Sequence, residues 1–198
     1  MSAEWIVVVV IVVVLALSAL GAAYLTAHRL DRLHIRTDLT RAALVGALER
    51  RHSVAAAVLH DLSNRDPDAG AALADALEHA RAQPPYSVIA VDPAPAPDSR
   101  PRRAGAEADI SAGRNAELAE NELGIILGGI DAEALPTGLA SELVDVTDRV
   151  SMARRFYNDA VRDTRNLREM GTVRVLRLAG RAPMPDYVEL VDVPPAGA

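Results

Sequence analysis

The chain has 198 residues and a net charge of −6, with 27 acidic residues and 21 basic residues that are all arginine. This acidic balance argues against nucleic-acid binding, which normally uses a basic face. The absence of cysteine excludes disulfides, thiolate metal sites and a cysteine nucleophile. Aromatic residues make up only 3% of the chain, so a core of Ala, Leu and Val is expected, which favours closely packed helices over a β-sandwich.

Residues 5–27 carry no charge and include the dense apolar run Ile6–Leu17. At ~1.5 Å per residue, a helix of this length crosses a hydrocarbon core of about 30 Å, so we expect these residues to span the lipid bilayer. Trp5 and Tyr24 lie near the two ends, where interfacial aromatics are common. A cleaved signal peptide is the competing interpretation. The residues before the apolar run include no basic side chain, and the run is longer than a typical signal-peptide core, which favours the membrane helix.

The flanking charges predict the orientation of this helix. Only the α-amine and Glu4 precede the apolar run, whereas a basic set follows it: Arg29, Arg32, Arg36 and Arg41. Basic flanks stay in the cytoplasm. We therefore expect a single-pass protein of the cell (inner) membrane, with its N-terminus outside and its C-terminal body cytoplasmic.

Residues 28–83 are expected to form the first helices of the body. The membrane helix should continue without proline to Ser63, as a rod of roughly 90 Å, and end before Pro67. A shorter Ala-rich helix is expected over 70–83. Residues 84–110 then form a Pro-rich linker, in which 86–91 (YSVIAV) should be an extended packed segment. Three arginines in the linker could contact anionic lipid, but we expect them to be solvated: Arg100, Arg102 and Arg103.

Residues 111–170 are expected to form a helical hairpin. Its first helix should run over 111–135, weakened near its end by Gly128 and Gly129. Its second helix, 139–169, carries small or apolar residues at alternating steps of four and three, which is the pattern of a helix in a multi-helix bundle: Leu139, Leu143, Val146, Val150, Ala153, Tyr157, Ala160, Thr164 and Leu167.

The tail, residues 171–198, is punctuated by proline and should pack back on the bundle. The predicted fold is therefore all-α: an N-terminal transmembrane helix continuous with a long antiparallel bundle of about four helices.

Three stretches together resemble the LemA family of single-pass bacterial membrane proteins. They are AENELG at 119–124, the specific run TDRVSMARRFYNDAVRD at 147–163, and PDYVE at 185–189, preceded in the chain by Arg50-Arg51-His52. The sequence differs from the family at Thr164-Arg165, where a second aromatic–Asn pair is expected. The resemblance implies a membrane-tethered antiparallel helical bundle with an external N-terminus and a cytoplasmic body. The LemA family itself is not similar to any characterised enzyme.

The second of these stretches contains a polar cluster: Arg154, Arg155, Tyr157, Asn158 and Arg162. As a recognition patch it could bind a partner protein or an anionic head group, because arginine binds carboxylate and phosphate with two hydrogen bonds. Alternatively, the arginines pair with the acids of residues 119–123, and Asn158 bonds across helices. Because Tyr157 falls on the apolar stripe, we favour the interhelical interpretation.

No motif for catalysis, phosphate binding or metal binding is found. The histidines do not have the spacing of helical metal ligands, and we expect them to lie at the surface or partly buried: His28, His34, His52, His60 and His79. The acids at helical spacing are expected to form a solvated face: Glu117, Glu120, Glu122, Glu142, Asp145 and Asp148. We therefore expect no catalytic residue, no metal, no cofactor and no small-molecule substrate.

These features favour a non-catalytic, membrane-anchored scaffold or adaptor that presents a helical surface to protein partners. A membrane-surface module that binds anionic lipid through the flanking and linker arginines is the alternative. An enzyme with an unrecognised site is the third possibility.

Overall fold

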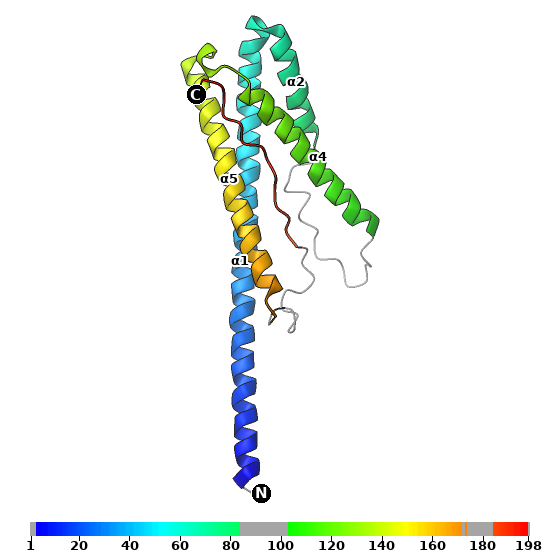
Figure 1. Cartoon of the computed structure of the whole chain (residues 1–198), viewed down its shortest axis with the longest axis vertical. Coiled ribbons are helices and arrows are strands. Elements are labelled where there is room, and N and C mark those ends of the chain that lie inside the picture. Colours follow the sequence, from blue (N-terminus) through cyan, green and yellow to red (C-terminus); the bar gives the residue numbers. More distant parts are fainter. Residues whose placement is uncertain (1–2, 84–102, 172, 174–183, 198) are drawn as a thin grey trace.

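The computed structural model describes residues 3–83, 103–171, 173 and 184–197. In these residues it contains four α-helices and no β-strand, which confirms the all-α helical bundle. The helices are α1 (Ala3–Arg65), α2 (Pro67–Ala82), α4 (Arg103–Gly128) and α5 (Thr137–Glu169), with a short 3-10 helix η1 (Ala132–Ala134) between the last two. Figure 1 shows α5 lying along α1, with α2 and α4 beside them.

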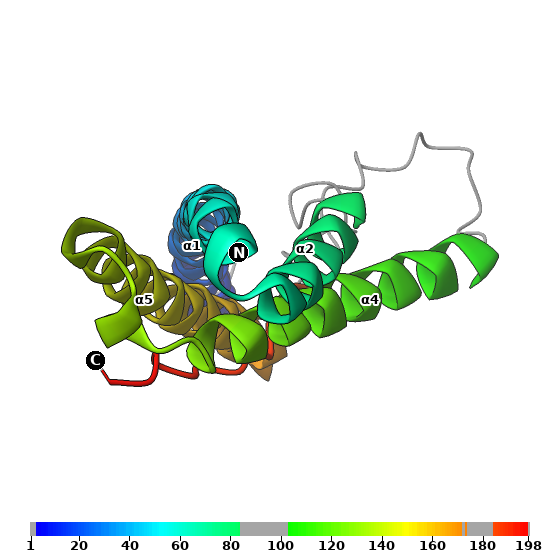
Figure 2. The same ribbon diagram turned by 90° about the horizontal axis from the view of Figure 1, so that it is seen from above.

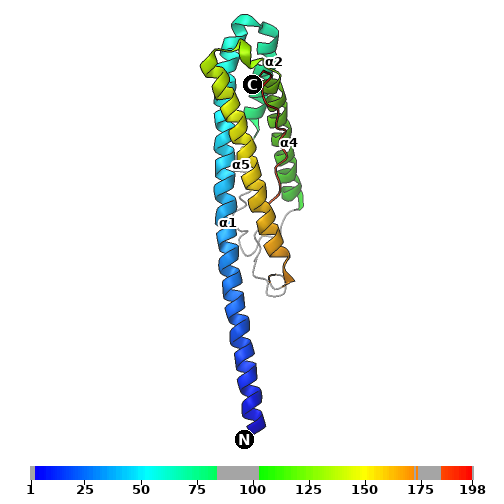
Figure 3. The ribbon, with the colours of Figure 1, turned by 60° about the vertical axis from the view of Figure 1, so that its left-hand side comes forward.

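Helix α1 runs without interruption for 63 residues, or about 95 Å at ~1.5 Å per residue. This confirms the continuous rod expected from the absence of proline. Its N-terminal part extends beyond the bundle, as Figure 3 shows most clearly. The large apolar side chains from Trp5 to Leu25 are 49–70% exposed, and the buried core begins only at Leu30. By length and composition, this part of α1 could cross a membrane.

Helix α5 buries the apolar stripe that its sequence predicts. Leu143, Val146, Val150, Tyr157 and the rest of the stripe are buried or partly buried, and the helix packs along α1 for most of its length. Thr164, at the family's expected aromatic position, is fully buried, and its hydroxyl lies 3.1 Å from the hydroxyl of Thr37 in α1. The smaller side chain is therefore matched by a small polar neighbour.

The other helices are arranged around this pair. Helix α2 packs on α1, and α4 packs on α2, so that α2 and α4 lie together on one side of α1 and α5 (Figure 2). The largest core cluster joins all four helices, with Val58, Leu73, Leu123 and Leu143 among its completely buried members.

The largest differences from the expected helix boundaries are at the two ends of α4. Helix α4 begins at Arg103, within the expected linker, because its first turns are rich in helix-forming alanine. It ends at Gly128 instead of Leu135, because Gly128 and Gly129 release the helix into a turn and η1. The expected packed segment 86–91, Arg100 and Arg102 lie outside the described residues.

The C-terminal segment, residues 184–197, has no regular secondary structure and runs between α4 and α5 toward η1 (Figure 1). Val188 and Leu190 are buried in contact with the core, while Tyr187, Glu189 and Val191 are exposed. At its end, Ala196 bonds through its backbone to Gly128 (3.1 Å) and Ala132 (2.9 Å). For residues 184–197, the prediction that the tail packs back on the bundle is confirmed.

Candidate functional site

Two asparagine side chains hold the C-terminal segment. In α5, the amide of Asn158 donates to the carbonyl of Val188 (2.9 Å) and accepts from its N–H (2.9 Å). In α4, the amide of Asn121 donates to the carbonyl of Glu189 (3.1 Å) and accepts from the N–H of Val191 (2.7 Å). Both side chains imitate the hydrogen bonding of a neighbouring β-strand. We call Asn121 and Asn158 the asparagine clamp.

The rest of the predicted polar cluster divides between the segment and solvent. The Tyr157 hydroxyl donates to the carbonyl of Asp186 (3.1 Å), and Arg154 forms an ion pair with Asp192. Arg162 pairs with Asp159 one turn away in α5 (3.0 Å), and Arg155 is exposed. The structure therefore brings Arg154, Tyr157 and Asn158 together on the C-terminal segment and leaves the other two outside.

The expected partners of this cluster were wrong. Arg154 pairs with Asp192 of the C-terminal segment rather than with the acids of residues 119–123, and Asn158 bonds to the same segment rather than across helices. The reason is geometric. Residues 184–197 lie between α4 and α5 at this level, so their polar groups are the ones within reach of Arg154 and Asn158.

A buried ionic cluster links α1 to α4 instead. Arg51 forms an ion pair with Glu120 and donates a second bond to its carbonyl (3.0 Å), while Nε2 of His52 lies 2.7 Å from the Glu120 carboxylate. Because an ionised carboxylate only accepts, Nε2 of His52 carries the shared proton. The side chains of Arg51 and Glu120 are 5% and 7% exposed. The prediction that Glu120 lies on a solvated face was therefore wrong.

The pKa of Glu120 reflects this environment. Burial is the largest single influence and opposes the charged carboxylate. The hydrogen bonds and positive charges of His52 and Arg51 together outweigh it, so the pKa lies below the usual glutamate value. Glu120 thus stays ionised and bonded to both Arg51 and His52, and it links α1 to α4.

A partial signal for this cluster is present in the sequence. Arg50-Arg51-His52 and residues 119–124 both belong to the stretches that resemble the LemA family, but nothing in the sequence pairs them. Asn121 of the clamp likewise lies within residues 119–124, and nothing in the sequence indicates its partner. A charged or amide side chain fits many partners, and only the packing of α1 and of the C-terminal segment against α4 selects one.

The other acids and histidines lie nearer the surface. His79 and Glu122 form an exposed pair at 3.0 Å, and Glu117, partly buried, faces the C-terminal segment. Burial raises the pKa of Glu117 above its usual value. Within the described residues, no group of three or more His, Asp or Glu side chains could hold a metal ion.

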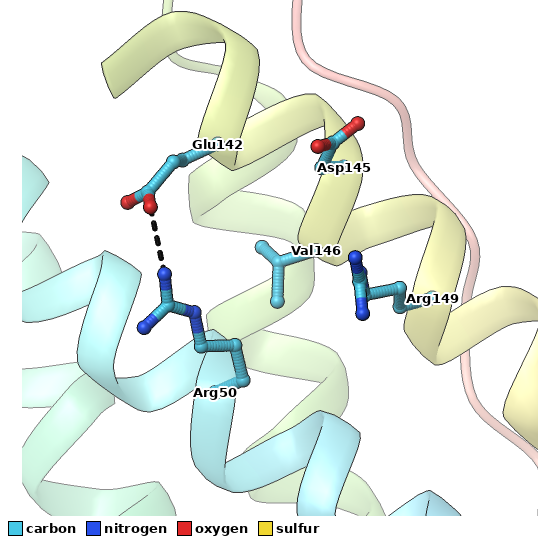
Figure 4. A pocket seen from close by; sticks show the side chains of 5 residues that line it. All are labelled: Arg50, Glu142, Asp145, Val146 and Arg149. Carbon is cyan, nitrogen blue, oxygen red and sulfur yellow. Dashed lines mark hydrogen bonds and ion pairs between the residues drawn. The ribbon is translucent and has the colours of Figure 1, made fainter. Parts of the chain in front are cut away.

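Helices α1 and α5 also border an open hollow of about 360 Å³. Figure 4 shows Arg50 of α1 bonded to Glu142 of α5 (2.7 Å), with Asp145 and Arg149 along the same wall. Both side chains of the ion pair are more than half exposed. The hollow is shallow and charged, and it resembles the space between two helix surfaces more than an enclosed ligand pocket.

The four arginines expected beside the membrane divide into two pairs. Arg29 and Arg32 are exposed where α1 leaves its apolar part. Arg36 instead pairs with Asp163 of α5 (3.0 Å), and Arg41 is buried, with its guanidinium 5.8 Å from the centre of the Tyr157 ring. Two of the four side chains therefore belong to the bundle.

No family model, curated protein or solved structure matches the chain. The resemblance to the LemA family stays a prediction carried by the sequence motifs alone. The class of protein that the fold defines is an all-α helical bundle with one long apolar helix extending from it.

Proposed function

We propose that the chain is a single-pass membrane scaffold of the LemA type. Residues 5–27 would lie in the bilayer, with the N-terminus outside and the bundle in the cytoplasm, presenting a helical surface to protein partners. One observation carries the proposal: the apolar part of α1 projects beyond the bundle with none of its side chains buried. So long an exposed apolar surface requires lipid or another apolar environment.

The polar residues support a non-catalytic role. Arg51, His52 and Glu120 are committed to one another, and Arg154, Tyr157 and Asn158 are committed to the C-terminal segment. Such groups fix the shape of the bundle and are not available to a substrate. Exposed apolar side chains on α4 and α5, such as Leu118, Ile125 and Phe156, remain for contacts with other proteins.

Membrane fractionation tests the anchor. The full chain should sediment with membranes and resist a carbonate wash. Val9→Arg with Val13→Arg should release it, because two charges in the middle of the span are costly to insert. Ser53→Arg with Ala57→Arg, at exposed positions on the bundle part of α1, is the matched control and should stay with the membrane. A wild-type chain found in the soluble fraction would refute the proposal.

Cysteine labelling tests the orientation, because the chain has no cysteine of its own. In intact cells, an impermeant maleimide should label Glu4→Cys but not Ser141→Cys, which is exposed near the start of α5. Permeabilised cells should show labelling at both positions. Labelling of Ser141→Cys from outside would reverse the orientation. Cross-linking and affinity capture from membranes would then identify protein partners.

The exposed Arg29 and Arg32 favour one second candidate, a module that binds anionic lipid. Because the core begins at Leu30, a body starting at residue 28 keeps its buried residues. If this candidate is right, residues 28–198 should float with anionic vesicles and should dissociate from them as the salt concentration rises. The scaffold proposal expects no flotation beyond that seen with neutral vesicles.

A further inference from the structure

Residues 184–197 lie between two helices whose facing residues are small or polar. We define the segment groove by six of these residues: Asn121, Gly124 and Gly128 on α4, and Ser151, Arg154 and Asn158 on α5. Each set recurs at steps of three and four, so it stays on one side of its helix. A Cβ atom at Gly128 would lie 2.8 Å from Cβ of Val193, and one at Gly124 would lie 3.7 Å from the carbonyl oxygen of Val191. The two glycines therefore let the backbone of an occupant approach α4 closely.

The groove recognises mainly the backbone of its occupant. The asparagine clamp forms four hydrogen bonds with backbone groups, which any extended segment carries. Side chains are selected at three positions. Val188 and Leu190 are buried against the core, and Asp192 pairs with Arg154 and accepts a hydrogen bond from Ser151 (3.1 Å). The groove thus fits an extended segment that has apolar residues two positions apart and an acid two positions after the second.

The chain's own segment is only shallowly buried in this groove. Val188, Leu190 and Pro195 are buried, and most other residues of 184–197 are exposed. The segment has no secondary structure of its own, and along 188–191 its described backbone hydrogen bonds go to side chains. Parts of a protein with few buried apolar contacts open locally while the rest stays folded. We therefore expect residues 184–197 to leave the groove without unfolding of the helices.

One position of the segment fits the groove poorly. The N–H of Glu189 points at a carboxylate oxygen of Glu117 on α4 (3.4 Å), so two negative side chains meet there. Burial chiefly, and the charge of Glu189 in addition, raise the pKa of Glu117, while Arg114 offsets part of the effect. Asp186, a third acid nearby, is paired with Arg165 (3.4 Å). An occupant with an uncharged residue in place of Glu189 would keep the backbone contact and lose the repulsion.

We propose that the segment groove is a protein-binding site that exchanges residues 184–197 for an extended segment of a partner protein. The partner segment has apolar residues at the positions of Val188 and Leu190, an uncharged residue between them and an acid at the position of Asp192. The clamp and Arg154 become available to it only when the chain's own segment leaves. This proposal rests on the scaffold function proposed above, because it names the site at which the scaffold receives a protein.

Two fluorescent peptides test the exchange on the full chain in detergent. One has the sequence of residues 184–198, and the other is the same peptide with Glu189→Gln. The Gln peptide should bind about three- to tenfold more tightly in an anisotropy titration, because it removes a like charge from a partly buried site. A peptide with Val188→Asp and Leu190→Asp is the control for non-specific binding and should not bind. Equal or tighter binding of the unchanged peptide would point to the segment of a second copy and overturn the proposal.

Hydrogen exchange shows whether the peptide takes the place of the segment. The amides of Val188 and Val191 donate to the clamp, and they should exchange at least about tenfold faster when the Gln peptide is bound. The amides of buried Leu123 and Leu143 should keep their protection. A peptide that binds without this change occupies another site, and the proposal is then wrong. A segment that exchanges as slowly as Leu123 and Leu143 opens only with global unfolding, which also overturns it.

Glu117→Gln tests the source of the preference. It should remove the difference between the two peptides, because no charge remains on α4 at that position to repel Glu189. Glu122→Gln, at an exposed position of α4 that pairs with His79, is the matched control and should keep the difference. The melting of both variants, followed by circular dichroism, identifies any loss of folding. A difference that survives in a folded Glu117→Gln chain would contradict the proposed occupant.

A further variant removes the objection that the chain's own segment hides the site. Asp192→Ala in the chain loses the ion pair with Arg154 and weakens the segment as a competitor, so it should bind the Gln peptide more tightly than wild type. Effective concentrations of tethered segments are about 1 mM. If neither chain binds the Gln peptide at this concentration, the groove does not exchange its occupant.

Membrane fractionation of the same chains distinguishes this proposal from the proposed function. A chain that stays with membranes, but whose segment opens only with global unfolding, would exclude the exchange and leave the anchor. A chain that is soluble and binds the Gln peptide in this groove would exclude the anchor and leave the exchange.

Discussion

Asn158 exchanges two hydrogen bonds with the backbone of a single residue, Val188, one through its amide N–H and one through its amide oxygen. The pairing is the one that a β-strand would offer, although it comes from a helix. It satisfies both backbone groups of a buried residue in a segment without secondary structure of its own. The C-terminal segment is therefore held by side chains where a sheet would use a neighbouring strand.

Asn158→Ala should release this part of the segment. It leaves the N–H and carbonyl of Val188 without their partner, at a cost of about 1–3 kcal/mol in the free energy of unfolding. Hydrogen exchange should show faster exchange at the amides of Val188 and its neighbours. Asn166→Ala, at an exposed position on α5, is the matched control and should change neither quantity. Unchanged protection at Val188 would show that the clamp is dispensable.

Glu120→Gln should destabilise the bundle strongly. It removes the charge that balances buried Arg51, and breaking a buried ion pair on one side costs about 3–5 kcal/mol. Denaturant unfolding followed by the helical circular dichroism signal would measure the loss. Glu122→Gln, two residues away and more than half exposed, should cost less than about 1 kcal/mol. Similar losses for the two variants would contradict the role of Glu120.

The same residue predicts part of the pH dependence of stability. Because the pKa of Glu120 is lower in the folded state than its ordinary value near 4.5, its ionised carboxylate stabilises the fold above that value. This contribution is lost as the pH falls through the lower, folded-state pKa. Glu117, whose pKa is raised by burial, acts in the opposite direction.

Comparing wild type with Glu120→Gln at each pH cancels the contribution of Glu117. The difference between their free energies of unfolding should be greatest at neutral pH and should shrink as the solution is acidified below about pH 4.5. A difference that stays constant down to the acid range would mean that the carboxylate charge is not what stabilises the fold.

Gly128→Ala should detach the end of the C-terminal segment. A Cβ atom there would lie 2.3 Å from Cγ1 and 2.8 Å from Cβ of Val193, so the segment has to move. We expect a loss of about 1–3 kcal/mol from this overpacking. Gly46→Ala is the matched control, in an open stretch of α1, and should stabilise the helix by about 0.5–1 kcal/mol. A neutral Gly128→Ala would show that Val193 is not held against α4.

The regular parts of the fold were readable from the sequence because they depend on repeated local patterns. The steps of four and three in α5, from Leu143 to Leu167, place one stripe toward α1 whatever the identity of the partner helix. The absence of proline between Ala3 and Arg65 likewise predicts one unbroken helix. Neither conclusion needs knowledge of which segments meet.

The polar contacts were not readable because they depend on which segments meet. Arg154 could have paired with any nearby acid, and only the path of residues 184–197 selects Asp192 over the acids of α4. Glu120 belongs to a row of similar acids, and only the approach of α1 distinguishes it from exposed Glu122. The start of α4 at Arg103 was missed because the prolines before it obscure the helix-forming residues that follow.

The unbroken backbone of α1 joins its apolar N-terminal part to the bundle as one continuous helix. Each residue added to this helix between Leu25 and Leu30 would turn everything after it by about 100° and push it out by ~1.5 Å. The direction in which the bundle faces relative to the apolar part of α1 is therefore set by the number of residues in this stretch, and a tilt of one part is carried to the other.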